Sequence, residues 1–266
     1  MNEAAKVMSV QPTATALIDP VRVFGGMSTR SRKMRVSLSM LELLAPTELS
    51  LLIEGETGVG KELAAESVHR ASSRSDRPFI VFDCAATSPA VGERELFGTQ
   101  DESPLSDEGM SGVLELAHGG TLFLDHVDEL VAPLQNRLQR VLERRQHRRV
   151  GGTQSIALDL RVISACTRSL RQNVRLGAFS PELYLQVGAE CIRIPPLRER
   201  LEDLLPLAQE FLASFHPAAV PGDIPEHVWS AFRDYQWPGN VRELRNALQR
   251  ALLVPERALR FSRGLK

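Results

Sequence analysis

Short apolar runs alternate along the chain with stretches in which apolar residues recur every three or four positions. The runs predict strands at about 50–54, 78–82, 121–125 and 160–165. The three- and four-residue spacing predicts helices at about 34–44, 61–71 and 134–143. Because strands and helices alternate, we expect a parallel sheet with helices on both of its faces.

The pattern changes at Pro195-Pro196. Beyond about residue 194 only helical spacing remains, at 201–215, 225–235 and 240–253. We therefore expect an α/β domain at 25–194 and a small all-α domain at 195–260. Residues 1–24 are predicted to be a linker or disordered lead-in, and residues 261–266 a tail. Arg198 and Arg200, at the junction, are candidates for ion pairs between the two domains.

Composition and charge exclude several classes. A net charge of −1 gives no global basic field for nucleic acid, and 5% aromatic residues argue against a stacking surface for single strands. Three scattered cysteines indicate buried thiols in a reducing compartment. The chain has no apolar run of membrane-spanning length and no signal-peptide pattern, so we expect a cytoplasmic protein without membrane contact. The basic run 144–149 is either a solvated face or a subunit or nucleotide contact.

The segment Gly55-Glu56-Thr57-Gly58-Val59-Gly60-Lys61-Glu62 follows a predicted strand and opens a predicted helix. In that setting, glycine-rich backbone N–H groups can surround phosphate oxygens, and Lys61 can reach the β- and γ-phosphates. The segment predicts a site for ATP or ADP. Glu62 stands where the usual pattern has a Ser or Thr that helps to hold Mg²⁺. The alternative is a strand-to-helix turn with no ligand.

Asp125 ends the third predicted strand and is the candidate Mg²⁺ ligand. The alternative role for Asp125 is capping of a following helix. Hydrolysis needs a carboxylate at the next position to polarise water, but His126 stands there. Asp128 and Glu129 lie past the strand end, and we expect them to face solvent.

The motifs together resemble the AAA+ domain of sigma-54-dependent transcription activators, the bacterial enhancer-binding proteins. The resemblance covers about residues 24–253 and rests on six segments, at 55–62, 95–98, 119–125, 149–152, 195–200 and 237–245. It implies a nucleotide-binding α/β domain with a helical lid, assembled as a ring with ATP between subunits. It also implies that Arg242 is the lid arginine that contacts the phosphates.

The chain departs from the family pattern at the positions that serve activity, so we identify it as a degenerate member. The acidic stretch Asp101–Ser106 replaces the loop that touches sigma-54, and that contact is not expected here. The other replaced positions are the catalytic Glu, its Asn partner, the γ-phosphate sensor and two arginine fingers, which read His126, Asp83, Thr167, Ser180 and Gln186. An arginine finger can contribute several powers of ten in rate.

Two positions that touch in the family have both changed type, which predicts a contact between Asp83 and His126; independent drift is the alternative. Our leading hypothesis is an ATP-binding module with weak or absent hydrolysis and a regulatory role in transcription, able to join a ring or a mixed ring. One alternative is an active ATPase that drives sigma-54-dependent transcription activation, with His126 or a bound water in the role of the catalytic Glu and Arg171 or Arg175 as finger. Another is an interaction scaffold without nucleotide. The sequence shows no DNA-binding helix-turn-helix, so it is either a fragment or a bare module.

Overall fold

The structure is a computed structural model that describes residues 20–86, 88–100 and 109–253. Most of the predicted lead-in (1–19), the acidic stretch at 101–106 and the tail at 261–266 lie outside the described residues. The described residues contain no helix long and apolar enough to cross a membrane.

A five-stranded parallel sheet forms the centre of the described structure, in the order β4-β5-β8-β3-β9. The strands are β3 (Leu51–Glu54), β4 (Phe79–Asp83), β5 (Thr121–Asp125), β8 (Arg161–Cys166) and β9 (Glu190–Arg193). The first four confirm the strands predicted from the apolar runs. The edge strand β9 was not predicted, because its sequence Glu-Cys-Ile-Arg has only two apolar residues.

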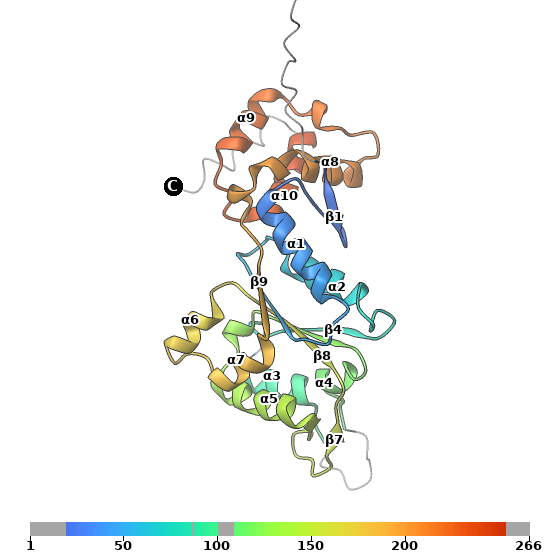
Figure 1. The fold of residues 1–266 in the computed structure, drawn as a ribbon, viewed down its shortest axis with the longest axis vertical. Coiled ribbons are helices and arrows are strands. Elements are labelled where there is room, and N and C mark those ends of the chain that lie inside the picture. The colour runs from blue at the N-terminus through green and yellow to red at the C-terminus, as the bar shows by residue number, and fades with distance from the viewer. Residues whose placement is uncertain (1–19, 87, 101–108, 254–266) are drawn as a thin grey trace, which may run out of the picture.

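Helices cover both faces of this sheet (Figure 1), as the alternating pattern predicts. Leu51 and Ile53 of β3 pack with α1 (Arg32–Leu44) and α2 (Lys61–Arg70). Leu52, between them, faces the other way into a second core cluster. That cluster lies under α3 (Pro89–Phe97), α4 (Val113–Leu116), α5 (Ala132–Arg144), α6 (Leu170–Arg175) and α7 (Pro181–Val187). The predicted α/β fold is therefore confirmed.

A smaller helical unit follows, at the top of Figure 1, and consists of α8 (Leu204–Phe215), α9 (Glu226–Asp234) and α10 (Asn240–Leu253). It has its own core, in which the Trp237 ring contacts Phe232 and Tyr235 edge-on. The helix predicted from 201 starts later, because Leu201–Asp203 forms a 3-10 turn. The later start places Pro206 in the first α-helical turn, where its missing N–H costs nothing.

Two antiparallel ribbons complete the described structure. The hairpin of β1 (Arg22–Phe24) and β2 (Met27–Thr29) starts inside the predicted 1–24 lead-in, so the folded part begins earlier than expected. The buried carboxylate of Asp203 accepts hydrogen bonds from Thr29 Oγ1 at 2.7 Å and Ser31 N at 2.9 Å, which fixes this hairpin to the helical unit. The second ribbon pairs β6 (Gln146–His147) with β7 (Ile156–Ala157), directly after α5.

Candidate nucleotide-binding site

The glycine-rich segment at 55–62 connects β3 to α2 at the carboxyl edge of the sheet. Gly58 and Gly60 have φ values of 80° and 104°, which L side chains rarely adopt. Strands that end at this edge also deliver Asp83, Asp125 and Thr167. In open parallel sheets ligands bind at this edge, so the fold gathers most of the predicted site residues in one place.

Lys61 is the first residue of α2 and is 8% exposed. Its Nζ donates to the carbonyl oxygens of Gly55 at 2.9 Å and Glu56 at 3.3 Å. Burial lowers the pKa of Lys61, and the negative charge of Asp125 acts in the opposite direction. The ammonium group is therefore held inside the loop, close to the sheet edge.

The helical unit rests directly on this loop. Arg242 N donates to Gly58 O at 3.2 Å, and Arg200 Nη2 donates to Val59 O at 3.1 Å. Asn240, fully buried at the start of α10, donates to Thr57 O at 2.9 Å and accepts from Leu197 N at 2.8 Å. A Cβ on Gly58 would lie 2.3 Å from Gly239 O, so the two backbones touch. The helical unit is thus a lid on the glycine-rich loop.

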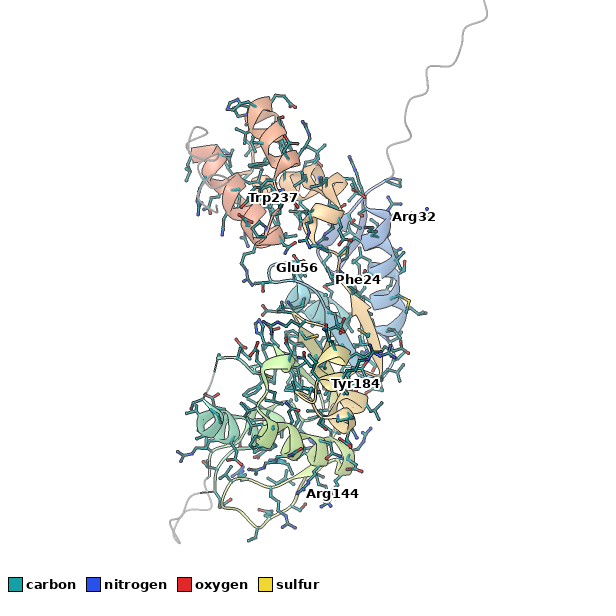
Figure 2. All side chains as sticks on the ribbon, turned by 90° about the vertical axis from the view of Figure 1, so that its left-hand side faces the viewer. Phe24, Arg32, Glu56, Arg144, Tyr184 and Trp237 are labelled. Carbon is teal, nitrogen blue, oxygen red and sulfur yellow. The ribbon has the colours of Figure 1, made fainter. Side chains whose placement is uncertain are left out.

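An ion pair reinforces the lid contact. Arg198 donates to both carboxylate oxygens of Glu56, at 2.7 and 2.5 Å. These bonds lower the pKa of Glu56, with a smaller contribution from Asn240. Figure 2 shows Glu56 at the junction between the lid and the sheet. The predicted interdomain ion pair of Arg198 is confirmed, whereas Arg200 lies 3.8 Å from Asp203 and binds the loop backbone instead.

Asp83, Asp125 and His126 meet where β4 and β5 end side by side. The register places Asp83 opposite Asp125. His126 has a left-handed backbone (φ 50°), and its Nδ1 lies 3.0 Å from Asp83 Oδ1 and 3.6 Å from Asp125 Oδ2. The predicted contact between Asp83 and His126 is therefore present.

Asp128 corrects an expectation from the sequence. We expected it to face solvent, but it is half-buried, and its Oδ1 is buried without a hydrogen-bond partner. The 3-10 turn Val127–Glu129 folds Asp128 back toward the site, where its charge acts on Lys61. Strand periodicity ends at Asp125, so the sequence could not show this turn.

The γ-phosphate sensor position and the two arginine-finger positions lie in different parts of the structure. Thr167 directly follows β8 beside the loop, where Gly55 N donates to Cys166 O at 3.2 Å. Ser180 Oγ caps α7 by accepting from Leu183 N at 3.1 Å. Gln186 lies beside Ser50, at the opposite end of β3 from the loop.

Arg171 and Arg175 are exposed on α6 without an ion-pair partner in the described part of the chain.

A glycine-rich loop on a parallel sheet, with lysine at the helix start and a helical lid above, defines a P-loop nucleotide-binding protein of the AAA+ class. Residues 27–193 match the sigma-54 interaction domain, and residues 198–259 match an AAA+ ATPase lid domain. The chain belongs to the sigma-54 interaction domain family, as the resemblance predicts.

Curated relatives and solved structures agree with this family assignment. The transcriptional regulatory protein ZraR of Klebsiella oxytoca is 40% identical over 233 residues, which are 86% of this chain and 52% of that protein. The nitrogen fixation protein VnfA of Azotobacter vinelandii is 40% identical over 240 residues, 89% of this chain and 45% of that protein. The structure of NtrX from Brucella abortus in complex with ATP has a TM-score of 0.78 and 34% identity, covering 86% of this chain and 53% of NtrX. The chain thus spans about half the length of these relatives.

Proposed function

We propose that this chain is the ATP-binding AAA+ module of a cytoplasmic, sigma-54-related transcription regulator, and that its own ATP hydrolysis is slow or absent. The contact between His126 and Asp83 carries the proposal. The family resemblance places a glutamate at position 126, where a carboxylate would polarise the attacking water. Here the position holds an imidazole whose Nδ1 already has a carboxylate partner.

The residues present fit a nucleotide. The backbone N–H groups of 55–62 and the Lys61 ammonium would hold the phosphates, with Arg242 approaching from the lid. Two glycines with left-handed φ give this loop the shape that such binding needs. The solved complexes of NtrX with ATP and with ADP support the assignment.

Asp125 would hold Mg²⁺. Within residues 20–86, 88–100 and 109–253, no three His, Cys, Asp or Glu side chains are arranged to hold a metal ion. Phosphate oxygens would therefore supply further ligands, which is the usual arrangement for Mg²⁺ at nucleotide sites. When bound, Mg²⁺ neutralises the charge of the phosphates. Glu62, in place of a hydroxyl residue, removes one customary ligand.

The finger positions support slow turnover. Ser180 and Gln186 carry no positive charge, and Ser180 is committed to capping α7. A neighbouring subunit with intact arginines could supply them in a mixed ring, and a regulatory subunit of such a ring is the role we propose. We do not expect the sigma-54 contact to run through the acidic stretch at 101–106.

The second candidate function is an active ATPase, and one observation favours it. The Oδ1 of Asp128 is buried near Lys61 and has no hydrogen-bond partner. A carboxylate in this state can accept a proton from water, as a general base must. Arg171 or Arg175 on α6 would then serve as the finger.

Calorimetry with ATP and Mg²⁺, followed by single-turnover hydrolysis, separates these alternatives. We expect saturable binding of ATP and ADP that Lys61→Ala abolishes, with hydrolysis near the uncatalysed background. Absence of binding to the wild-type chain would favour the interaction scaffold. Turnover well above background, lost in both Lys61→Ala and Asp128→Asn, would favour the active ATPase.

A gain-of-function variant directly tests the role of the contact between His126 and Asp83. Asp83→Asn with His126→Glu restores the residue pair that the family resemblance implies. We expect this double variant to hydrolyse ATP at least about 100-fold faster than wild type, the lower end of the range ascribed to a general base. Asp83→Asn alone is the matched control, since it removes the partner charge without adding a base. Equal rates in both variants would contradict the proposal.

A further inference from the structure

A groove lined by arginines runs along α5, at the end of the molecule opposite the lid. Figure 2 places Arg144 at this end and Trp237 in the lid. The groove has a volume of about 520 Å³, and its polar lining includes Arg137, Arg140, Arg144, His147, Arg148 and Ser155. We refer to it as the α5 groove. It is remote from the glycine-rich loop and takes no part in the proposed nucleotide site.

The α5 groove has an excess of positive charge. Arg140, Arg144 and Arg148 are exposed and have no carboxylate partner in the described part of the chain. Arg137 differs, because it pairs with Glu93 at 2.5 Å and its guanidinium lies over the Phe97 ring. The nearby carboxylate of Glu115 is taken by Arg149 at 2.8 Å. Three unneutralised guanidinium groups therefore face the same space.

The arginines on α5 form a row. Arg137, Arg140 and Arg144 follow at intervals of three and four residues, which places them on one face of α5, and Arg140 and Arg144 are the two members of this row without a carboxylate partner in the described residues. At 1.5 Å per residue the row spans roughly 10 Å along the helix. Guanidinium groups bind phosphate oxygens through paired hydrogen bonds. A row of this kind suits successive phosphates along a strand better than one compact anion.

A buried histidine gives a second, independent indication of a ligand. His147 lines the α5 groove from β6 and is 3% exposed, yet neither ring nitrogen has a hydrogen-bond partner. The nearest carboxylate oxygen, on Glu115, is 3.7 Å from Nε2. Burial lowers the pKa of His147, so the neutral ring keeps one N–H donor. A buried donor without a partner is costly, and a phosphate oxygen would satisfy it once the ring, whose side chain is fully enclosed in this structure, turns toward the groove.

We propose that the α5 groove binds the sugar–phosphate backbone of double-stranded nucleic acid without reading its base sequence. The lining contains no Phe, Tyr or Trp on which unpaired bases could stack, which favours a duplex over a single strand. The overall charge of −1 does not oppose this, because charges farther than about 8 Å away are largely screened in physiological salt.

Fluorescence anisotropy with a labelled DNA duplex of about 20 base pairs and arbitrary sequence tests the proposal, at salt from about 0.05 M to about 0.2 M. The test variant is Arg140→Gln with Arg144→Gln. The matched control, Arg32→Gln with Arg77→Gln, removes the same charge from exposed arginines outside the groove. We expect the test variant to bind roughly 50-fold more weakly, with a log–log salt slope smaller by about two.

A variant of His147 tests the groove without changing the net charge of the protein. His147→Leu should weaken duplex binding several-fold but leave the salt slope unchanged, because a neutral donor releases no counterion. Lys61→Ala should leave duplex binding unchanged. Thermal melts followed by circular dichroism establish that each variant is folded before binding is compared.

Several outcomes would overturn the proposal. These are absence of duplex binding at about 0.05 M salt, equal losses in the test and control variants, or loss of binding in Lys61→Ala. Tighter binding of a single strand of the same length would refute the duplex assignment. Binding of poly-glutamate through the same arginines, without duplex binding, would reassign the groove to an acidic polypeptide.

Discussion

His126 Nδ1 lies 3.0 Å from Oδ1 of Asp83, across the carboxyl ends of two adjacent parallel strands. Asp83 Oδ1 also accepts from Ala85 N at 3.0 Å, so the carboxylate is anchored to the backbone that directly follows its strand. His126 in turn donates its backbone N–H to Asp125 Oδ1 at 2.9 Å. The three residues form one connected group at the position where the family resemblance places the machinery of hydrolysis.

This contact should be measurable as a coupling energy. Asp83→Ala, His126→Ala and the double variant form a cycle, read by urea denaturation. We expect a coupling of about 0.5 kcal/mol, modest because both side chains are partly exposed. The cost of alanine at the left-handed backbone of residue 126 occurs in two variants and cancels. A coupling below about 0.1 kcal/mol would show that the pair contributes nothing to stability.

Gly58→Ala should disrupt the contact between lid and loop. The added methyl group would lie 2.3 Å from Gly239 O, and φ is +80°. We expect a loss of about 3 kcal/mol in the free energy of unfolding, from backbone strain and overpacking together. Both tryptophans, Trp229 and Trp237, lie in the lid, so their fluorescence in urea reports its unfolding.

A matched glycine separates the two causes. Gly177 has a similar φ of +71°, but a methyl group added there would meet only open space. Gly177→Ala should therefore show only the backbone strain, about 1 kcal/mol. If both variants lose the same stability, the approach of Gly239 to Gly58 has no energetic weight.

The pair of Glu56 and Arg198 should make stability depend on acid pH. Hydrogen bonds from Arg198 lower the pKa of Glu56 below its usual 4.5 in the folded state. The stabilisation is therefore present above about pH 4.5 and is lost as the pH falls through the folded-state pKa. Both side chains are more than a third exposed, so we expect less than about 1 kcal/mol.

Urea denaturation of wild type and Glu56→Gln across acid pH checks this. The stability difference between the two should shrink as the pH falls. Glu202→Gln, at an exposed glutamate without an ion-pair partner in the described residues, controls for loss of charge alone. A difference for Glu56→Gln that grows toward low pH would contradict the sign of the effect.

Arg161 should be essential for stability although it lies far from the site. Its guanidinium is 1% exposed and donates to the carbonyls of Ala45 at 2.6 Å and Leu44 at 2.9 Å, at the end of α1. Arg161→Met would leave these buried acceptors unpaired, for a loss of about 3 kcal/mol by urea denaturation. Arg193→Met, on the exposed side of β9, should change stability by less than about 0.5 kcal/mol. Similar losses in both variants would refute the capping role.

The sequence predicted the parts of the fold that repeat a simple period. The four apolar strands, the first helices and the lid helices appear within a few residues of their expected places. The contact between Asp83 and His126 was also predicted, from the resemblance to a family in which the residues at these two positions touch.

Features that depend on tertiary contacts could not be predicted. The edge strand β9 is defined by pairing with β3 rather than by its own apolar content. The burial of Asp128 follows from a 3-10 turn, and that of His147 from a two-residue ribbon. The basic run 144–149 was visible in the sequence, but only the structure shows which of its arginines share a groove with Arg140.

The touching backbones of Gly58 and Gly239 have one further consequence. Because the two backbones are in contact, a change in the shape of the loop would move the lid, and a molecule that stabilises one shape of the loop would thereby favour one position of the lid. In such an arrangement, binding at the loop would change the equilibrium position of the lid. Its output would follow how often the loop is filled, and with which molecule, even where no bond is ever broken.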